Sequence, residues 1–250
     1  MKNLRSIENA LKRTTDTKAL IIGDGATARA PEMFLHLFPG KKAVIVADET
    51  TWEIAAGDVY GYMKAAGIAM AEPFVFHSKN FYAEWSFVEE LEGYLGSVDA
   101  VPVAVGAGVV NDLTKLVSEH LGRRYMIVAT TVSMDGFSAC GASIIKDGFK
   151  RTFDCRAPYG IIVEPAVAAR APKYLAVSGY ADLLAKIPAG ADWIAADAMG
   201  CERIDEFSYS LVHDGLRESL AHPEAVYAGE IPAIEKLAEG LILSGFAMQA

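Results

Sequence analysis

The sequence has few cysteines, no long apolar run and no export signal, and each of these absences narrows its function. Its three cysteines, Cys140, Cys155 and Cys201, are widely spaced and form no CxxC pair. Isolated cysteines in odd number favour reduced thiols, so we expect a cytoplasmic protein without a disulfide framework. No apolar run reaches the roughly 18–20 residues of a membrane helix, and residues 1–10 lack the apolar core of a signal peptide. We therefore expect no membrane partner.

Positive charge is also scarce, because 23 Lys and Arg face 32 Asp and Glu, which gives a net charge of −9. A nucleic-acid-binding protein needs a basic face to neutralise phosphates, so we expect no nucleic-acid partner. Hydrophobic residues make up 52% of the 250 residues. This is enough apolar material for a substantial core, in one large domain or two smaller ones.

Short apolar runs alternate with helical patterns over the first two thirds of the chain. This alternation predicts an α/β fold with a parallel sheet and helices on both of its faces. We expect helices between the strands of this sheet. Before the first strand we expect an amphipathic helix over residues 1–15, with Leu4, Ile7 and Leu11 on one face. An Asp147-Gly148 turn predicts a hairpin of residues 143–145 and 150–153. The strands are expected at residues 18–22, 43–47, 72–76, 101–105, 125–129 and 161–163, and the helices at 26–37, 50–66, 84–95 and 109–119.

After Pro165 the composition changes, because alanine becomes abundant and strand patterns disappear. We therefore place a domain boundary here, with an α/β domain over residues 1–164 and an incomplete helical domain over residues 165–250. The helices of the second domain are expected to be joined at Pro172, Pro188-Ala189-Gly190, His222-Pro223 and Ile231-Pro232.

A strand, a glycine loop and a helix follow one another over residues 98–119. Gly106, Ala107 and Gly108 end the strand, and apolar residues then recur at helical spacing. Such a loop leaves free N–H groups and the positive end of a helix dipole pointing at one place, which suits a phosphate. The alternative is a tight turn without a ligand, since the third glycine of the usual dinucleotide fingerprint is missing.

Polar side chains stand at three further positions where a ligand could bind. Asn111 and Asp112 lie in the first turn of the helix after the glycine loop, where they can cap its amides or bond a ligand. Asp48 follows a predicted strand and suits either a ribose or the N-cap of the next helix. Asp182 lies early in an alanine-rich helix, where a carboxylate is either a helix-start charge or a metal ligand.

The order and spacing of three stretches resemble the iron-containing alcohol dehydrogenase superfamily. The stretches are Gly106 to Lys115, Thr130 to Gly136 and Ser178 to Trp193. Within it, Ser133-Met134-Asp135-Gly136 and Ala181 to Lys186 are most similar to sn-glycerol-1-phosphate dehydrogenases of the AraM type. The resemblance implies a Rossmann-like nucleotide-binding domain followed by an all-α domain, the dehydroquinate synthase-like architecture, with the active site between them.

The resemblance further implies NAD(P)-dependent and metal-dependent reduction of dihydroxyacetone phosphate, a phosphorylated small molecule, to sn-glycerol 1-phosphate. NAD or NADP and a divalent metal (zinc, nickel or iron) would be the cofactors, and we expect a homo-oligomer. Asp48 at the ribose favours NAD without excluding NADP.

By the same resemblance, each part of the cofactor and substrate has its own set of residues. Asp135 and Asp182 would be catalytic and touch the substrate, and Asp182 would also ligate the metal. Thr130, Thr131 and Ser133 would line the nicotinamide side. The pyrophosphate would meet Gly106, Ala107, Gly108, Val109 and Val110, with Asp112 steadying the loop.

The sequence also departs from this family. The family completes its metal site with two histidines from later helices, and no matching histidine follows residues 241–250, so we expect a C-terminally truncated form. Ala139 replaces a serine that contacts the cofactor in relatives, and Ala107 replaces a glycine. The alternatives are a 3-dehydroquinate synthase or a glycerol dehydrogenase of the same superfamily. A third is a non-catalytic nucleotide-binding remnant that senses cofactor or pairs with another chain.

Overall fold

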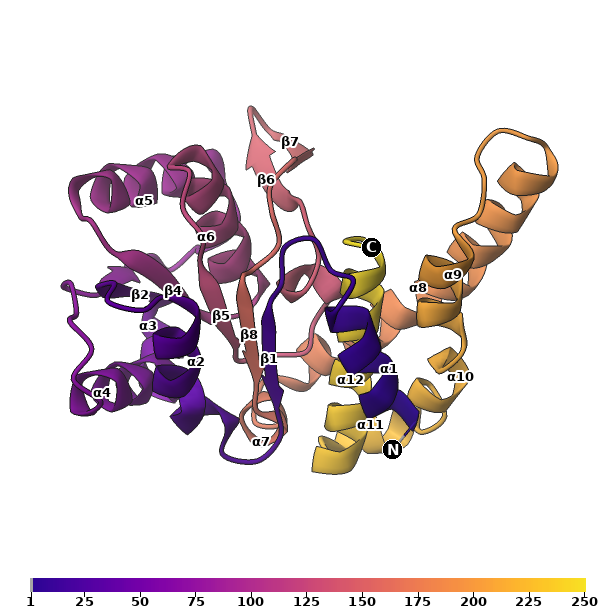
Figure 1. Ribbon diagram of the computed structural model, residues 1–250, viewed down its shortest axis with the longest axis horizontal. Helices are drawn as coiled ribbons and strands as arrows, with labels where there is room; N and C mark the ends of the chain where they lie inside the picture. Colours follow the sequence, from indigo (N-terminus) through magenta and orange to yellow (C-terminus); the bar gives the residue numbers. More distant parts are fainter. Residues whose placement is uncertain (1) are drawn as a thin grey trace.

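A six-stranded, fully parallel sheet in the order β1-β8-β5-β4-β2-β3 organises the first part of the chain (Figure 1). The structure, a computed structural model, describes residues 2–250, with side chains from residue 7 onward. The predicted α/β alternation is confirmed. The strands are β1 (Ala19–Ile22), β2 (Ala43–Asp48), β3 (Phe74–Phe76), β4 (Val101–Gly106), β5 (Met126–Ala129) and β8 (Gly160–Val163).

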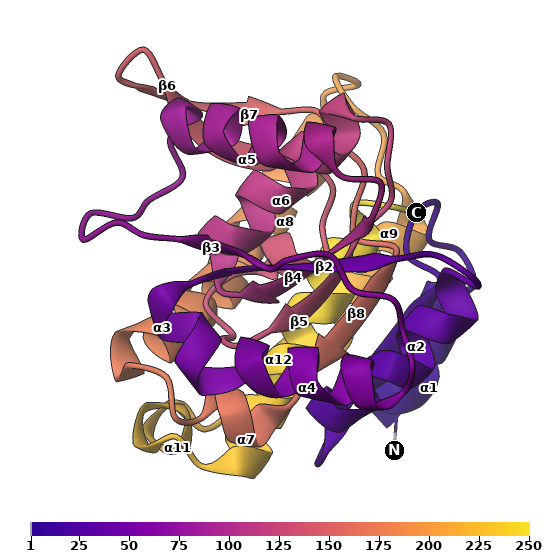
Figure 2. The same cartoon turned by 90° about the vertical axis from the view of Figure 1, so that its left-hand side faces the viewer.

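Helices cover both faces of this sheet (Figure 2). Successive side chains of the inner strands point to opposite faces, so each face has its own buried core. On one face, Ile45 of β2 packs with Phe34 and Met63 of α2 (Ala30–Leu37) and α4 (Gly57–Ala65). On the other face, Val44 belongs to the core formed by α5 (Trp85–Ser97) and α6 (Gly108–His120). Burying each such side chain stabilises the fold by about 1.5–3 kcal/mol. The short η1 (Ala26–Arg29) leads from β1 into α2, and α3 (Glu49–Thr51) and the π-helical η2 (Trp52–Ala56) lead from β2 into α4.

A two-stranded hairpin of β6 (Ala142–Lys146) and β7 (Phe149–Phe153) projects beside the sheet (Figure 1). Its turn residues Asp147 and Gly148 have φ of 54° and 77°. Positive φ at both central residues is the geometry of the tight hairpin turn that Asp-Gly favours. The hairpin predicted from this dipeptide is therefore confirmed.

The chain after β8 is helical, as expected, and a helix begins at three of the four predicted joints. The 26-residue α8 runs straight through Pro188, so the predicted joint at Pro188-Ala189-Gly190 is wrong. A proline inside a helix removes one hydrogen bond and costs about 3 kcal/mol. Leu183 and Gly190, on either side of it, are both buried, so a break would lose the packing of half the helix. The helices are α7 (Pro165–Ala168), α8 (Lys173–Ala198), α9 (Glu206–His213), α10 (Leu216–Ser219), α11 (Pro223–Ala228) and α12 (Ile231–Ala247).

The N-terminal helix α1 (Lys2–Leu11) lies beside α12 among the later helices (Figure 1). It is shorter than predicted, and Met1 and the side chain of Leu4 lie outside the described residues. Ile7 is buried, which fits the predicted amphipathic face. The division of the chain into domains at residue 164 stays a prediction. Of the described helices, none is long and apolar enough to cross a membrane.

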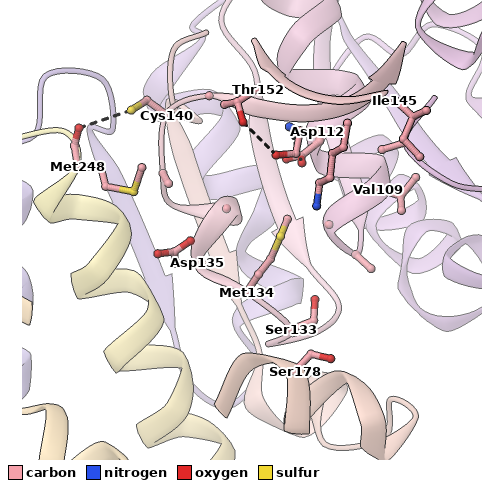
Figure 3. Close-up of a pocket in the computed structure, with 18 of the residues that line it drawn as sticks. Val109, Asp112, Ser133, Met134, Asp135, Cys140, Ile145, Thr152, Ser178 and Met248 are labelled. Atoms are coloured by element: carbon pink, nitrogen blue, oxygen red, sulfur yellow. Dashed lines mark hydrogen bonds between the residues drawn. The ribbon is translucent and has the colours of Figure 1, made fainter. Parts of the chain in front are cut away.

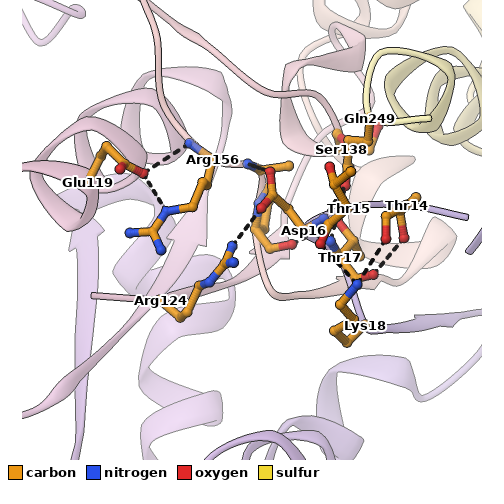
Figure 4. A network of polar contacts seen from close by, with 12 residues as sticks. Thr14, Thr15, Asp16, Thr17, Lys18, Glu119, Arg124, Ser138, Arg156 and Gln249 are labelled. Carbon is orange, nitrogen blue, oxygen red and sulfur yellow. Dashed lines mark hydrogen bonds and ion pairs between the residues drawn. The ribbon is translucent and has the colours of Figure 1, made fainter. Parts of the chain in front are cut away.

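Gln249 ties the two ends of the chain together (Figure 4). Its Oε1 accepts from the backbone N–H of Thr17 at 3.0 Å, and its Nε2 donates to the Thr17 hydroxyl at 3.0 Å and to the carbonyl of Ser138 at 2.6 Å. Asp16, which precedes Thr17, forms an ion pair with Arg124, with 2.8 Å between Oδ1 and Nη1. The segment before β1, the loop after β5 and the residues after α12 are thereby held at one point.

Candidate functional site

A cleft of about 650 Å³ lies where the glycine loop, the loop after β5, the hairpin and α8 meet. Figure 3 shows Met134 in the middle of the labelled side chains, with Asp135 on one side and Ser133 and Ser178 below it. The structure brings six of the predicted site residues into the lining of this cleft. They are Ala107, Gly108, Val109, Asp112, Ser133 and Asp135.

The glycine loop leads directly into α6 and leaves the start of that helix without a side-chain cap among the described residues. The first backbone bond of the helix runs from the N–H of Asn111 to the carbonyl of Ala107 at 3.0 Å. The preceding N–H groups are therefore available to an anion, as predicted for a phosphate-binding loop. Ala107 has φ of −84°, so its methyl group causes no backbone strain and the missing glycine is tolerated.

Both glycines of this loop lie in close contact with other side chains. A Cβ on Gly106 would lie 2.7 Å from the Cβ of Val110, and a Cβ on Gly108 would lie 2.6 Å from the Cε of Met134. The Met134 side chain also lies against Gly136. Sequence reasoning did not single out Met134 as a site residue. Its thioether is flexible, so it can move aside when a ligand approaches the loop.

Below the loop, Lys115 and Asp112 form hydrogen bonds that hold backbone segments together. The ammonium of the fully buried Lys115 donates to the carbonyls of Gly136, Ala139 and Gly141 at 2.7, 2.9 and 2.8 Å. Asp112 Oδ2 accepts from the N–H of Ser143 at 3.2 Å. Burial raises the pKa of Asp112, and the nearby charge of Lys115 opposes this rise. This arrangement fits the predicted steadying role of Asp112.

The hydroxyl residues after β5 lie next to the glycine loop. The N–H of Thr130 donates to the carbonyl of Gly106 at 3.1 Å, and the hydroxyls of Thr131 and Ser133 lie 3.3 Å apart. The buried Thr130 hydroxyl has no hydrogen-bond partner within the described part of the chain. A buried unpaired hydroxyl is unusual and suits a place where a ligand completes the hydrogen bonding.

Asp48 lies at the end of β2 and forms the N-cap, which was one of its two predicted roles. Its carboxylate accepts from the N–H of Thr51 at 2.9 Å, and its own N–H donates to the Thr51 hydroxyl at 3.1 Å. It does not line the 650 Å³ cleft. Its role at a ribose stays a prediction.

Asp135, which lines the cleft, contacts Asp182 of α8, and Lys186 lies beside both carboxylates. Asp182 Oδ2 accepts from the N–H of Asp135 at 2.8 Å. Lys186 Nζ lies 2.7 Å from Asp135 Oδ2 and 3.5 Å from Asp182 Oδ1. The Ser244 hydroxyl of α12 donates to the same Asp135 oxygen at 2.7 Å. Burial lowers the pKa of Lys186, but its hydrogen bond and charge interaction with Asp135 outweigh this, so the net pKa is raised.

Sequence reasoning did not assign roles to Lys186 and Ser244. The position of Lys186 four residues after Asp182, on the same helix face, was a usable signal. Ser244 lies more than a hundred residues from Asp135 and carried no such signal.

The described residues do not form a resident metal site. Among them, no group of three or more His, Cys, Asp or Glu side chains could hold a metal ion. Asp182 is also engaged on both oxygens, by an N–H donor and by an ammonium. No catalytic step is therefore derived through a metal.

The fold and the loop define an α/β protein with a parallel sheet, a glycine loop before α6 and a helical extension, and comparison with known families agrees. A family model described as iron-containing alcohol dehydrogenase matches residues 21–172. The chain belongs to the iron-containing alcohol dehydrogenase family.

Curated relatives narrow this further, since they are named glycerol-1-phosphate dehydrogenase (NAD(P)+). The relative from Bacillus velezensis is 30% identical over 97% of this chain and 62% of its own length. The relative from Pyrococcus furiosus is 28% identical over 92% of this chain and 65% of its own length. The chain thus spans less than two thirds of these relatives. The predicted resemblance is confirmed.

Solved structures share the fold at low identity. Glycerol dehydrogenase from Schizosaccharomyces pombe has a TM-score of 0.76 at 20% identity, over 94% of this chain and 61% of that one. A probable glycerol dehydrogenase from Sinorhizobium meliloti has a TM-score of 0.73 at 18% identity, over 93% and 66%. They confirm the predicted fold class.

Proposed function

We propose that this protein reduces dihydroxyacetone phosphate to sn-glycerol 1-phosphate with NADH or NADPH. The observation that supports this most is the start of α6, which has no side-chain cap. It follows two closely packed glycines and faces a cleft that Asp135 also lines. The names of the curated relatives supply the reaction.

In this proposal the cofactor supplies a hydride, and the chain binds and orients the reactants. The N–H groups at the start of α6, from Gly108 onward, would bind the pyrophosphate, with Gly106, Ala107, Val109 and Val110 around it. Thr130, Thr131 and Ser133 would line the nicotinamide. Asp48 would accept hydrogen bonds from the ribose.

Asp135 would orient the substrate by accepting a hydrogen bond from its hydroxyl group. Its carboxylate is fixed by Lys186 and Ser244, so it needs no rearrangement to do so. Asp182 would position Asp135 through the backbone bond between them. A divalent metal at Asp182 stays a prediction, which rests on the family resemblance.

Nucleotide binding can be tested with Gly108→Ala. The added methyl group displaces Met134 and occupies the space in front of the free amides, so NADH should bind about tenfold more weakly, or worse. NADH fluorescence titration measures this. Gly93→Ala is the matched control, because nothing lies within 4 Å of the position of its added Cβ. Equal NADH affinities for G108A, G93A and the unchanged protein would contradict the proposed phosphate site.

The reaction is tested by parallel assays of dihydroxyacetone phosphate, glycerol and the substrate of 3-dehydroquinate synthase. Turnover of dihydroxyacetone phosphate alone supports the proposal, and turnover of either other substrate supports the corresponding relative. NADH binding without any turnover would identify a non-catalytic nucleotide-binding protein.

The preferred cofactor is tested at Asp48. Because a carboxylate repels a 2′-phosphate, Asp48→Asn should weaken NADH binding more than NADPH binding. Thr51→Val is the control, since it removes the other half of the same N-cap pair. If both substitutions change the two affinities equally, Asp48 acts only as an N-cap.

We also propose a cytoplasmic homo-oligomer. The three cysteines are free thiols, which supports a reducing compartment. Leu184, Ile187 and Ile194 are exposed apolar side chains on α8, which supports association. Light scattering coupled to size-exclusion chromatography measures the mass, and a monomer at all concentrations would contradict the proposed assembly.

A further inference from the structure

A second cavity, of about 730 Å³, lies at the edge of the sheet opposite to the glycine loop. Its lining comes from segments that lead into strands, since Lys42 directly precedes β2, and Asp99 and Arg124 each lie two residues before β4 and β5. The glycine loop follows the other end of β4, about 16 Å away along the strand. Open parallel sheets bind nucleotides beyond the carboxyl ends of their strands, so this cavity is separate from the cleft described above.

The lining of this cavity is basic, although the protein as a whole carries a net charge of −9. Among the described residues that line it, five are cationic and one, Asp99, is acidic. A hollow lined by one sign of charge concentrates the electric field and attracts ions of the opposite sign. The cationic residues are Lys18, Lys41, Lys42, Arg123 and Arg124.

The two arginines are held in place by other parts of the chain. Arg123 Nη1 donates to the carbonyls of Leu95 and Val98 at 2.8 and 2.7 Å. Arg124 Nη1 donates to Asp16 Oδ1 at 2.8 Å (Figure 4). Within the described residues, the Nε and Nη2 donors of both arginines have no hydrogen-bond partner. Each guanidinium is therefore fixed in advance and keeps donors for an anion, which reduces the entropy lost on binding.

Lys41 and Lys42 carry charge that the fold does not use. Both are exposed, and neither has a hydrogen-bond or ion-pair partner among the residues that the structure describes. They lie between α2 and β2, directly after the turn that ends α2. Lys18 differs from them, because its Nζ donates to the carbonyls of Thr14 and Thr15 at 2.9 and 3.0 Å. Two lysines and two arginines are thus available to one ligand.

The volume and charge of the cavity indicate the class of that ligand. Sites for small molecules have volumes of about 300–1,000 Å³, so 730 Å³ admits a molecule of the size of a nucleotide or smaller. Arginine and lysine bind phosphate groups, arginine through paired N–H donors. Four cations exceed the charge of a single phosphate group, which is about −1.5 to −2. The lining therefore favours a ligand with two phosphates in a row.

We propose that this basic cavity is a second ligand site, which binds a small molecule that carries a diphosphate group. Arg123 and Arg124 supply fixed donors, and Lys41 and Lys42 supply charges on flexible stems that can follow the phosphates. The site does not depend on the proposed dehydrogenase reaction, because none of its lining residues lines the cleft at the glycine loop.

The first test measures diphosphate binding with and without the two free lysines. Sodium pyrophosphate is titrated into the full chain at low salt, and binding is followed by calorimetry. The double variant Lys41→Gln/Lys42→Gln should bind it about tenfold more weakly than the unchanged protein, because two opposite charges have been removed. The matched control Lys12→Gln/Lys79→Gln removes the same charge at two exposed lysines outside the cavity and should not change the affinity.

Pyrophosphate can also bind at the start of α6, and Gly108→Ala separates the two sites. The binding that depends on Lys41 and Lys42 should persist in G108A. Four outcomes overturn the proposal. They are no pyrophosphate binding by the unchanged protein, an unchanged affinity in K41Q/K42Q, an equal loss in K12Q/K79Q, and the disappearance of all binding in G108A. Circular dichroism establishes that each variant is folded.

The same calorimetry with other anions identifies the kind of ligand. ADP that binds more tightly than pyrophosphate, with the same dependence on Lys41 and Lys42, identifies a nucleotide. Weaker lysine-dependent binding of ADP identifies a diphosphate without a nucleoside. Inorganic phosphate should bind about tenfold more weakly than pyrophosphate, and equal affinities contradict a diphosphate site. A single-stranded oligonucleotide that binds more tightly than pyrophosphate and ADP, with the same lysine dependence, also overturns the proposal.

A second test uses the unchanged protein and so does not depend on a variant. Lysine acetylation by an N-hydroxysuccinimide ester is followed by peptide mass spectrometry, with and without pyrophosphate. Pyrophosphate should slow the acetylation of Lys41 and Lys42 several-fold, because the bound anion covers their amines. Exposed Lys79 is the internal control and should not change. Unchanged rates at Lys41 and Lys42 under saturating pyrophosphate contradict the proposal.

Discussion

Two helices on opposite sides of the loop over residues 130–141 each carry an aspartate followed by a lysine one turn later. On α6 the pair is Asp112 and Lys115, and on α8 it is Asp182 and Lys186. In each pair the aspartate accepts a backbone N–H from beyond its own helix, and the lysine bonds to the loop. By sequence the two pairs look alike.

Their surroundings give them different roles. Lys115 has no exposed side-chain surface and donates to three backbone carbonyls, which cannot move independently of the loop. Lys186 keeps about a quarter of its side chain exposed and bonds to carboxylates next to a cavity. The first lysine is fully buried in the fold, whereas the second stays in contact with solvent. Burial and the nature of the acceptor, rather than residue type, therefore distinguish the two pairs.

The largest expected effect is at the fixed pair. Lys115→Met removes the ammonium that donates to the carbonyls of Gly136, Ala139 and Gly141, and it leaves the buried Asp112 without the positive charge 3.7 Å away. The free energy of unfolding should therefore fall by about 3–5 kcal/mol. Urea unfolding followed by circular dichroism measures it. Lys41→Met, at an exposed lysine, is the control and should change stability little. A loss below about 1 kcal/mol for K115M would show that the two pairs are equivalent.

The second effect concerns the surface on which α8 meets the loop. A Cβ on Gly179 would lie 1.9 Å from the carbonyl oxygen of Val132, a backbone atom. Gly179→Ala must therefore push α8 away from the loop, at a cost of about 2–3 kcal/mol in the free energy of unfolding. Gly108→Ala meets only the flexible end of Met134 and should cost less than about 1 kcal/mol. Thermal unfolding of both variants tests this, and equal losses would show that the α8 contact is no more rigid than Met134.

The pair on α8 should matter less for stability. Lys186→Met should lower the free energy of unfolding by about 1 kcal/mol, because Asp135 keeps its hydrogen bond from Ser244 and both carboxylates remain partly solvated. The same urea experiment measures it beside K115M. A loss as large as that of K115M would mean that Lys186 is as firmly built in as Lys115.

The smallest effect is on pH dependence. Burial raises the pKa of Asp112 above its ordinary value of 3.8, so the native state holds this proton when the unfolded state has lost it. Its contribution to stability is therefore full below that value and is lost as the pH rises through the raised pKa. Asp112→Asn should flatten the fall in stability as the pH rises above that ordinary value, relative to the unchanged protein. Identical slopes for D112N and the unchanged protein would refute the assignment.

Much of the fold could be predicted because its signals are local. The apolar runs that form β2, β4 and β5 are short and buried on both faces, and the Asp147-Gly148 turn has one favoured geometry. Pro188 misled the prediction because the packing that keeps α8 continuous involves residues on distant segments. A proline has a local cost, but only tertiary contacts decide whether the helix can bear it.

The site was only partly predictable, for a related reason. The glycine loop, Ser133 and Asp135 follow strand ends, and parallel strands bring such ends together. The position of Met134 over Gly108 and the meeting of Lys186 with Asp135 depend on how side chains reach between segments about 25 and 50 residues apart. Lys115 lies one turn beyond the glycine loop, but its ammonium bonds to backbone carbonyls of the loop over residues 130–141. A sequence pattern gives the position of a charged residue along a helix but not the direction of its side chain.

The bonds of Gln249 have a consequence for how the chain folds. They join residues 232 positions apart, so the segment before β1 gains these bonds only after α12 and Gln249 have been synthesised. During translation the sheet can assemble while its first strand still lacks this anchor. Contacts between residues this far apart in sequence slow folding. We therefore expect the hydrogen bonds between Gln249 and Thr17 to form late in folding.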